Sequence, residues 1–160
     1  MIRKTAITMC LGLFICLNIE ATMVSFFIIE TGVPAEGTRR QHSMQWENTL
    51  LDVFFDEGYI VSNAVTLRLD SKPSGEIQKI FEADITEAGN TGANYFIIAQ
   101  LDYSTGSQMP LEITLVLFST NPNKKIFENQ MSGRTYRTTR EEVDALKIIA
   151  RGLIPHINAQ

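Results

Sequence analysis

The segment EAGNTGANYFIIAQLDYS, residues 87–104, decides the predicted fold. Its second part, residues 93–103, is rich in aliphatic and aromatic side chains, which favours a β-strand. Side chains alternate between the two faces of a strand, so the odd-numbered residues 95–101 are expected to face one layer and Phe96 and Ile98 the other. Apolar residues on both faces predict a central strand that is covered on both sides.

Three amphipathic helices are predicted around this strand. The first covers Met44–Glu57, with Ser43 as its cap and Gly58 as its stop. The second has apolar residues at helical spacing over residues 77–88 and ends at the following glycine-rich turn. The third begins at Thr138 or Thr139, because each lies three residues before a glutamate and forms a candidate capping box.

Four further apolar segments predict strands: Met23–Ile29, Tyr59–Ala64, Leu111–Thr120 and Lys124–Tyr136. The order is therefore β-α-β-α-β-β-β-α, in the α/β (α+β-like) class. Strand-helix-strand units favour parallel pairing and short turns favour antiparallel pairing. We expect a single mixed β-sheet of about five strands packed with three helices.

Length and composition predict one globular domain. The chain has 160 residues, of which 44% are hydrophobic and 20% charged, enough to close one core. We assign residues 22–160 to this domain. The formal net charge is -4, and the Lys and Arg residues are scattered, so nucleic acid is not an expected partner.

Residues 1–21 have the pattern of a signal peptide. Arg3 and Lys4 precede an apolar stretch, and Ala21 supplies a small residue for cleavage. The alternative is an uncleaved anchor, which would bury Glu20 in the bilayer at a cost of about 2.5–3.5 kcal/mol. We expect an exported, periplasmic or envelope-associated protein that meets a membrane only through this segment, if it is retained.

Both cysteines, Cys10 and Cys16, lie within the signal segment. Removal of the signal would leave no thiol for a disulfide scaffold or a zinc-thiolate site. Lipid attachment at Cys16 is disfavoured, because the bulky Ile15 stands where a small residue is needed. We expect no metal and no cofactor.

The combination of elements resembles a known family. The segments VSFFIIE (24–30), FFDEGYIV (54–61), EAGNTGANYFIIAQLDYS (87–104) and STNPNKK (119–125), followed by an amphipathic helix, are similar to the small α/β domain of TolB (amino-terminal), CsgG and LpoB-type activators of peptidoglycan synthesis. Asn94 stands where that family usually has aspartate. The resemblance implies a small domain of the cell envelope and leaves its partner open.

Two basic segments are candidates for a partner surface. Arg39, Arg40 and His42 follow the first strand, where open α/β sheets favour ligand contacts. The spacing of Gly32 and Gly37 matches a phosphate loop, but Thr and Arg replace the required Lys and Ser or Thr. This segment is therefore interpreted as a contact loop.

Arg134 and Arg137 lead into the last helix, whose amino terminus favours anions such as an acidic partner. The alternative is local pairing of these arginines with Glu141 and Glu142.

Other polar groups favour structural interpretations. Asp52 and Asp56 lie one helical turn apart and match a solvated face better than a metal site. The only histidines are His42 and His156, and no nucleophile-elbow motif accompanies them. Trp46 is expected in the core.

We therefore expect a non-enzymatic exported domain that acts through protein–protein contacts, as a regulator or assembly factor in the envelope. The alternative is a small-ligand-binding or hydrolase domain whose site is not visible in the sequence.

Overall fold

The computed structural model describes residues 21–32, 41–103, 107 and 109–159. The strands are β1 (Met23–Thr31), β2 (Ile60–Asn63), β3 (Leu67–Leu69), β4 (Tyr95–Asp102), β5 (Glu112–Thr120) and β6 (Asn123–Ser132). The helices are α1 (Gln41–Asp56), α2 (Ile77–Ile80), α3 (Glu82–Asn90), α4 (Thr139–Arg151) and α5 (Ile154–Asn158).

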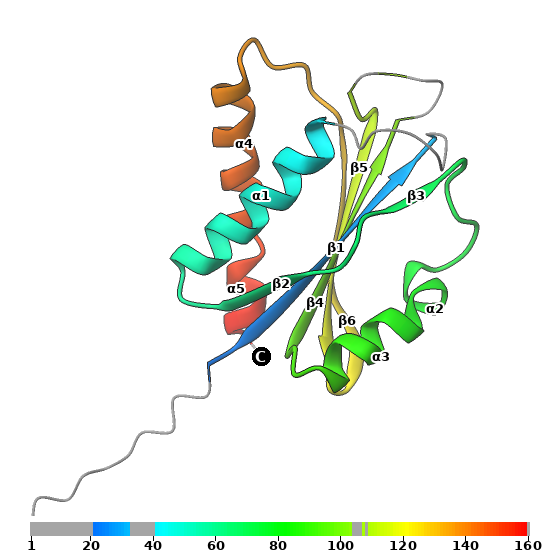
Figure 1. Ribbon diagram of the computed structural model, residues 1–160, viewed down its shortest axis with the longest axis vertical. Helices are drawn as coiled ribbons and strands as arrows, with labels where there is room; N and C mark the ends of the chain where they lie inside the picture. Colours follow the sequence, from blue (N-terminus) through cyan, green and yellow to red (C-terminus); the bar gives the residue numbers. More distant parts are fainter. Residues whose placement is uncertain (1–20, 33–40, 104–106, 108, 160) are drawn as a thin grey trace, which may run out of the picture.

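The strands form one six-stranded mixed sheet in the order β2-β1-β4-β5-β6, and β3 also pairs with β1 (Figure 1). β1 is parallel to β2, β3 and β4, whereas β4, β5 and β6 are antiparallel. This confirms the predicted α/β class and the mixed sheet. The additional strand is β3, whose three residues are too few to produce a recognisable alternation.

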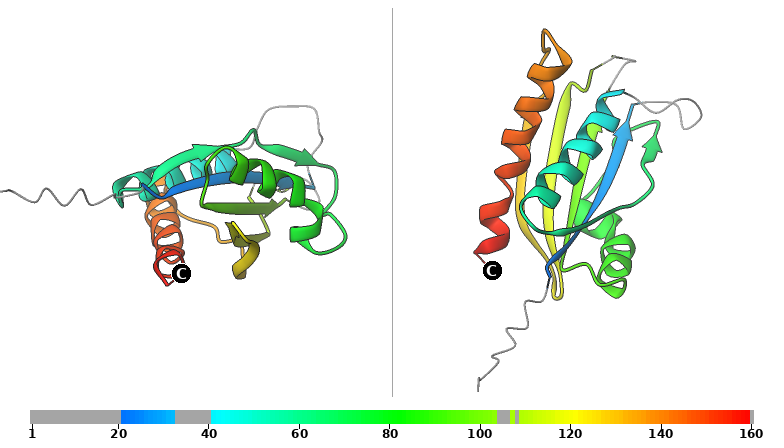
Figure 2. Two further views of the ribbon diagram at one scale, coloured as in Figure 1. Left: turned by 90° about the horizontal axis from the view of Figure 1, so that it is seen from below. Right: turned by 60° about the vertical axis from the view of Figure 1, so that its left-hand side comes forward.

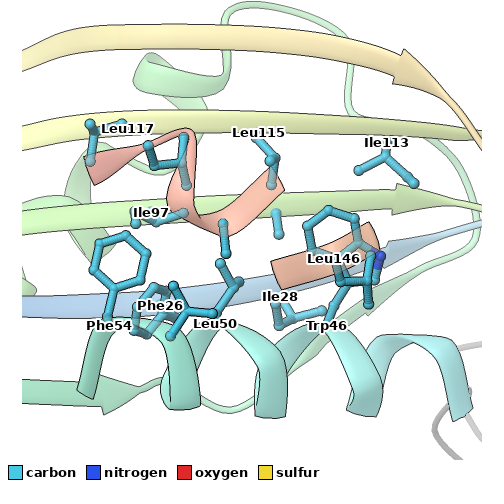
Figure 3. Packing of buried hydrophobic residues seen from close by; sticks show 14 of the residues in the cluster. Phe26, Ile28, Trp46, Leu50, Phe54, Ile97, Ile113, Leu115, Leu117 and Leu146 are labelled. Atoms are coloured by element: carbon cyan, nitrogen blue, oxygen red, sulfur yellow. The ribbon is translucent and has the colours of Figure 1, made fainter. Parts of the chain in front are cut away.

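The helices cover both faces of the sheet (Figure 1). α1, α4 and α5 lie over one face, and α2 and α3 lie over the other, so each face has its own buried apolar cluster. Side chains of α1, among them Trp46, Leu50 and Phe54, point toward Phe26 and Ile97 of the sheet (Figure 3). This confirms that Trp46 is a core residue.

The central strand β4 alternates as predicted. Tyr95, Ile97, Ala99 and Leu101 pack in the cluster beneath α1, whereas Phe96 and Ile98 pack in the cluster beneath α3. β4 lies between β1 and β5, and buried apolar side chains cover both of its faces. It is therefore a central strand buried on both sides.

The predicted start of the first helix is wrong. α1 begins at Gln41, and Ser43 lies inside it, fully buried. Its hydroxyl lies 2.9 Å from the hydroxyl of Tyr103, so a tertiary contact uses the side chain that was expected to cap the helix. The predicted stop is confirmed, since Gly58 has a φ of 88° and its backbone N–H donates to Phe55.

Two of the predicted helices are each divided into two segments. The second is interrupted at Phe81, between α2 and α3. The third is divided around Gly152 and Leu153, and α5 continues roughly in line with α4 (Figure 2). Thr138 caps α4, because its Oγ1 accepts a hydrogen bond from the Glu141 N–H at 3.1 Å.

Several predictions concern residues outside the described part of the chain. These are the signal peptide within residues 1–20, with Cys10 and Cys16, and the loop residues Arg39 and Arg40. The boundary at residue 22 stays a prediction. None of the helices in the described residues has the length and apolar character needed to span a membrane.

Candidate functional site

His42 and Glu142 join the first turns of α1 and α4. His42 Nδ1 lies 2.5 Å from Glu142 Oε1, and the two side chains are 19% and 7% exposed. With its amide nitrogen turned toward the carboxylate, Gln45 donates to Glu142 Oε2 at 2.8 Å. Glu142 is therefore buried with hydrogen-bonding partners on both oxygens, as a buried carboxylate requires.

Further polar pairs attach α1 to the sheet. The buried hydroxyls of Ser43 and Tyr103 are hydrogen-bonded, and Tyr103 directly follows β4. Glu47 accepts a hydrogen bond from the Asn63 amide at the end of β2. We call His42, Ser43 and Glu47, together with their partners, the α1 polar cluster. Because Ser43 is buried and bonded to Tyr103, its hydroxyl is not presented to a substrate.

A buried ion pair lies near the end of β1. Glu30 is fully buried, and its Oε2 accepts a hydrogen bond from Arg68 Nε at 2.8 Å. The two residues are register partners across β1 and β3. The ion pair therefore links β3 to β1 through side chains as well as through the backbone.

The structure brings His42 close to the predicted basic segment before α4. Burial raises the pKa of Tyr136, with the charges of Glu142 and Glu141 acting in the same direction and Arg134 opposing them. Tyr136 therefore lies within electrostatic range of Glu142, the residue that His42 contacts.

Arg134 and Arg137 themselves are exposed. Among the described residues neither guanidinium forms an ion pair, although the Arg137 backbone N–H donates to Glu141 Oε2 at 3.0 Å. Their side chains are thus accessible to a partner.

The other polar candidates do not converge on one site. His156 stacks on Phe127 with ring centroids 4.1 Å apart, whereas His42 contacts α4. Asp52 and Asp56 are exposed on α1, as predicted. Within the described ranges, no group of three or more His, Cys, Asp or Glu side chains has the geometry of a metal site.

A second candidate site lies on the opposite face of the sheet and was missed from the sequence. It is a pocket of about 560 Å³ between residues 72–78 and strands β4, β5 and β6. Gln100, Thr114 and Gln130 are register partners on these strands and line it as a polar row. We call it the polar-row pocket. The available signal was the polar Gln100 between the apolar residues Ala99 and Leu101 of β4.

Gln100 is an unusual residue for the interior of a central strand. It is 2% exposed, and within the described part of the chain its Nε2 has no hydrogen-bonding partner. Two ion pairs flank the pocket, Lys72 with Glu112 and Lys125 with Glu128. The hydrogen bond from Lys72 lowers the pKa of Glu112, and the hydrogen bond to Glu128 raises the pKa of Lys125.

Apolar side chains are exposed along one edge of the sheet. Phe55 at the end of α1, Ile60 in β2 and Val65 in the β2–β3 connection are 69%, 50% and 90% exposed. β2 and β3 pair only with β1 among the described strands, so their outer backbone edge is open. We call these three residues and the open strands the edge surface.

Comparison with known proteins gives a family and a fold. A family model described as "Uncharacterised protein" matches residues 26–120. No curated protein matches the chain. The PelC dodecamer from Paraburkholderia phytofirmans is 17% identical with a TM-score of 0.51, and the match covers 85% of this chain and 87% of PelC. This likeness shows a shared fold.

Weaker structural likeness extends to two other bacterial proteins. The LpoB C-terminal domain from Salmonella enterica is 12% identical, with a TM-score of 0.45 and coverage of 72% of this chain and 84% of that domain. Lipoprotein GNA1162 from Neisseria meningitidis is 10% identical, with a TM-score of 0.42 and coverage of 88% and 99%. LpoB, to which the sequence was predicted to be related, is thus among the structural neighbours, whereas the relation to TolB and CsgG stays a prediction.

Proposed function

We propose that this chain, which belongs to the uncharacterised-protein family whose model matches residues 26–120, is an exported domain of the cell envelope that acts through protein–protein contacts. The observation that carries the proposal is the edge surface. Its three apolar side chains lie beside a strand edge that no other described strand covers, and such edges recruit further strands unless something covers them.

The partner that we propose first is a second copy of the chain. PelC has the same fold over most of both chains and forms a dodecamer. Assembly of copies would cover Phe55, Ile60 and Val65 and satisfy the open backbone of β2 and β3. A different envelope protein is the other outcome that the experiment distinguishes.

The test is site-specific photo-crosslinking of the full chain in cells. A crosslinker at Val65 is expected to give a product whose mass is a multiple of the chain mass, whereas one at the exposed Asp144 of α4 is not. A product of another mass would identify a different envelope partner. Absence of any product at Val65 contradicts the proposal.

A matched pair of variants connects the product to the edge surface. Phe55→Ser combined with Ile60→Ser should abolish it, because both changes remove exposed apolar area. Ile148→Ser is the control, since Ile148 is 71% exposed but lies on α4. Cell fractionation and amino-terminal sequencing test export: we expect a mature protein that begins at Thr22.

The basic segments are a second proposed contact surface, for an acidic partner. It consists of Arg39, Arg40, His42, Arg134 and Arg137, of which the last two have exposed side chains. Replacing Arg134 and Arg137 with glutamate should weaken capture of a partner that dissociates at high salt, because exposed charge pairs are screened. Unchanged capture would exclude this surface.

A further inference from the structure

The polar-row pocket contains a buried amide whose nitrogen has no hydrogen-bonding partner within the described residues. Gln100 is 2% exposed, it lines the pocket, and its Nε2 has no partner among them. A buried amide N–H group that has lost water without gaining a hydrogen bond destabilises the native state, so it calls for an explanation. We propose that the polar-row pocket binds a small zwitterion, with the chemistry of an amino acid or short peptide, whose carboxylate or carbonyl oxygen accepts a hydrogen bond from Gln100.

The floor of the pocket supplies the required polar contacts. Gln100 pairs with Thr114, and Thr114 pairs with Gln130, so an amide, a hydroxyl and a second amide lie side by side across three strands. Thr114 is 6% exposed, whereas Gln130 on the edge strand β6 is exposed. The row therefore extends from the solvent-exposed Gln130 to the buried amide of Gln100. A molecule bound along it would be most shielded from water where it contacts Gln100.

A second unpartnered group lies on the same side of the sheet. Thr31 is fully buried in β1, and its Oγ1 has no partner within the described residues. Ile29 is the register partner of Gln100, and Thr31 is two residues further along, so Thr31 and Gln100 face the same layer. Thr31 does not line the pocket, so the proposal rests on Gln100, and Thr31 shows only that this layer of the sheet contains a second unpaired polar group.

The charges around the pocket select the class of ligand. Among the lining residues the charges of Lys72 and Lys125 balance those of Glu76 and Glu128. Lys72 and Lys125 are already paired with carboxylates of Glu112 and Glu128. If a ligand separates one of these ion pairs, a zwitterion can neutralise both the freed lysine and the freed carboxylate. A simple anion or cation would neutralise only one of them and leave the other charge uncompensated. The volume of about 560 Å³ lies within the usual range for small-molecule sites.

This proposal is independent of the edge surface. Phe55, Ile60 and Val65 do not line the pocket, and the pocket lies between residues 72–78 and β6. Failure of one proposal therefore leaves the other intact.

The test is a titration of the ¹⁵N-labelled full chain, monitored through its side-chain amide signals. The probes are glycine and L-alanyl-L-alanine as zwitterions, glucose as a neutral polyol and acetate as an anion. Both zwitterions should shift the Gln100 signal saturably, while the signal of Gln45, on the opposite face, stays unchanged. Glucose and acetate should produce no saturable shift at the same concentration.

Variants separate a binding role from a structural one. Gln100→Leu should abolish the ligand-induced shift of the Gln130 signal and leave the Tm equal to or above that of the wild type, because an apolar side chain replaces an amide whose buried nitrogen is unpaired. Lys72→Met should weaken zwitterion binding several-fold. Asn129→Ala, on β6 but outside the pocket lining, should bind like the wild type.

Three results would overturn the proposal. The first is the absence of a saturable shift with either zwitterion, or an equal response to glucose or acetate. The second is unchanged zwitterion binding by Gln100→Leu. The third is a marked fall in the Tm of that variant, which would show that the amide already has a structural partner.

Discussion

His42 Nδ1 lies 2.5 Å from Glu142 Oε1, so two first turns that are 100 residues apart in sequence are directly connected. At the other ends of the same helices, Arg151 Nε lies 3.9 Å from Glu57 Oε1. The two contacts show that α1 and α4 run in the same direction across the sheet. The His42–Glu142 contact is the more shielded of the two, because Arg151 and Glu57 are both largely exposed.

The first prediction concerns Glu142. Glu142→Ala should lower the free energy of unfolding by about 1–3 kcal/mol, because it leaves His42 and Gln45 without their shared acceptor. The control is Asp144→Ala, since Asp144 is exposed on the same helix, and its effect should stay within about 0.5 kcal/mol. Urea denaturation measures both changes. Equal effects of the two variants would show that the His42–Glu142 contact contributes nothing to stability.

The second prediction concerns the core beneath α1. Ile97 is fully buried in β4, so Ile97→Ala should cost about 2–5 kcal/mol through lost burial and the cavity that remains. Ile148→Ala is the control, because Ile148 is 71% exposed on α4, outside the edge surface, and its substitution should change stability little. Equilibrium unfolding in urea compares them. A loss below about 1 kcal/mol for Ile97→Ala would contradict the observed position of the core.

The pattern of β4 was predictable because both faces of a central strand exclude water. Its odd-numbered apolar residues and the pair Phe96 and Ile98 already define two layers in the sequence. The helix stop at Gly58 was predictable for a local reason too, because few residues other than glycine adopt its positive φ.

Ser43 shows why the start of α1 was not predictable. Its hydroxyl matches a cap locally, but Tyr103 supplies a partner from another part of the chain. The polar-row pocket was hidden for the same reason. Its three polar residues become neighbours only through the register of β4, β5 and β6, namely Gln100, Thr114 and Gln130. A local sequence pattern does not specify that register.

The third prediction distinguishes the two overlapping capping boxes. Thr138 Oγ1 accepts the hydrogen bond from the Glu141 N–H, whereas Thr139 is the first residue of α4. Thr138→Ala should therefore cost about 1 kcal/mol, and Thr139→Ala should cost clearly less. Thermal unfolding of the two single variants is the measurement. A larger loss of stability for Thr139→Ala would show that Thr139 caps the helix and that the helix starts one residue later.

The fourth prediction concerns the acid side of the stability profile. The hydrogen bond from Lys72 lowers the pKa of Glu112 below its ordinary value of 4.5. A lowered pKa in the folded state stabilises the protein above the ordinary pKa, and this contribution is lost as the pH falls through the folded pKa. Lys72→Met should therefore reduce stability at neutral pH but not at a pH below the folded pKa of Glu112.

The size of this effect is limited by solvent. The side chains of Lys72 and Glu112 are 44% and 34% exposed, and partly exposed ion pairs contribute about 0–1 kcal/mol. Carboxyl titration by NMR is the more sensitive measurement: Lys72→Met should return the pKa of Glu112 toward 4.5. Lys79→Met is the control, because Lys79 is 81% exposed and pairs with Glu76 instead. A Glu112 pKa that is unchanged in Lys72→Met would show that another group holds it low, and the charge balance argued for the polar-row pocket would then have to include that group.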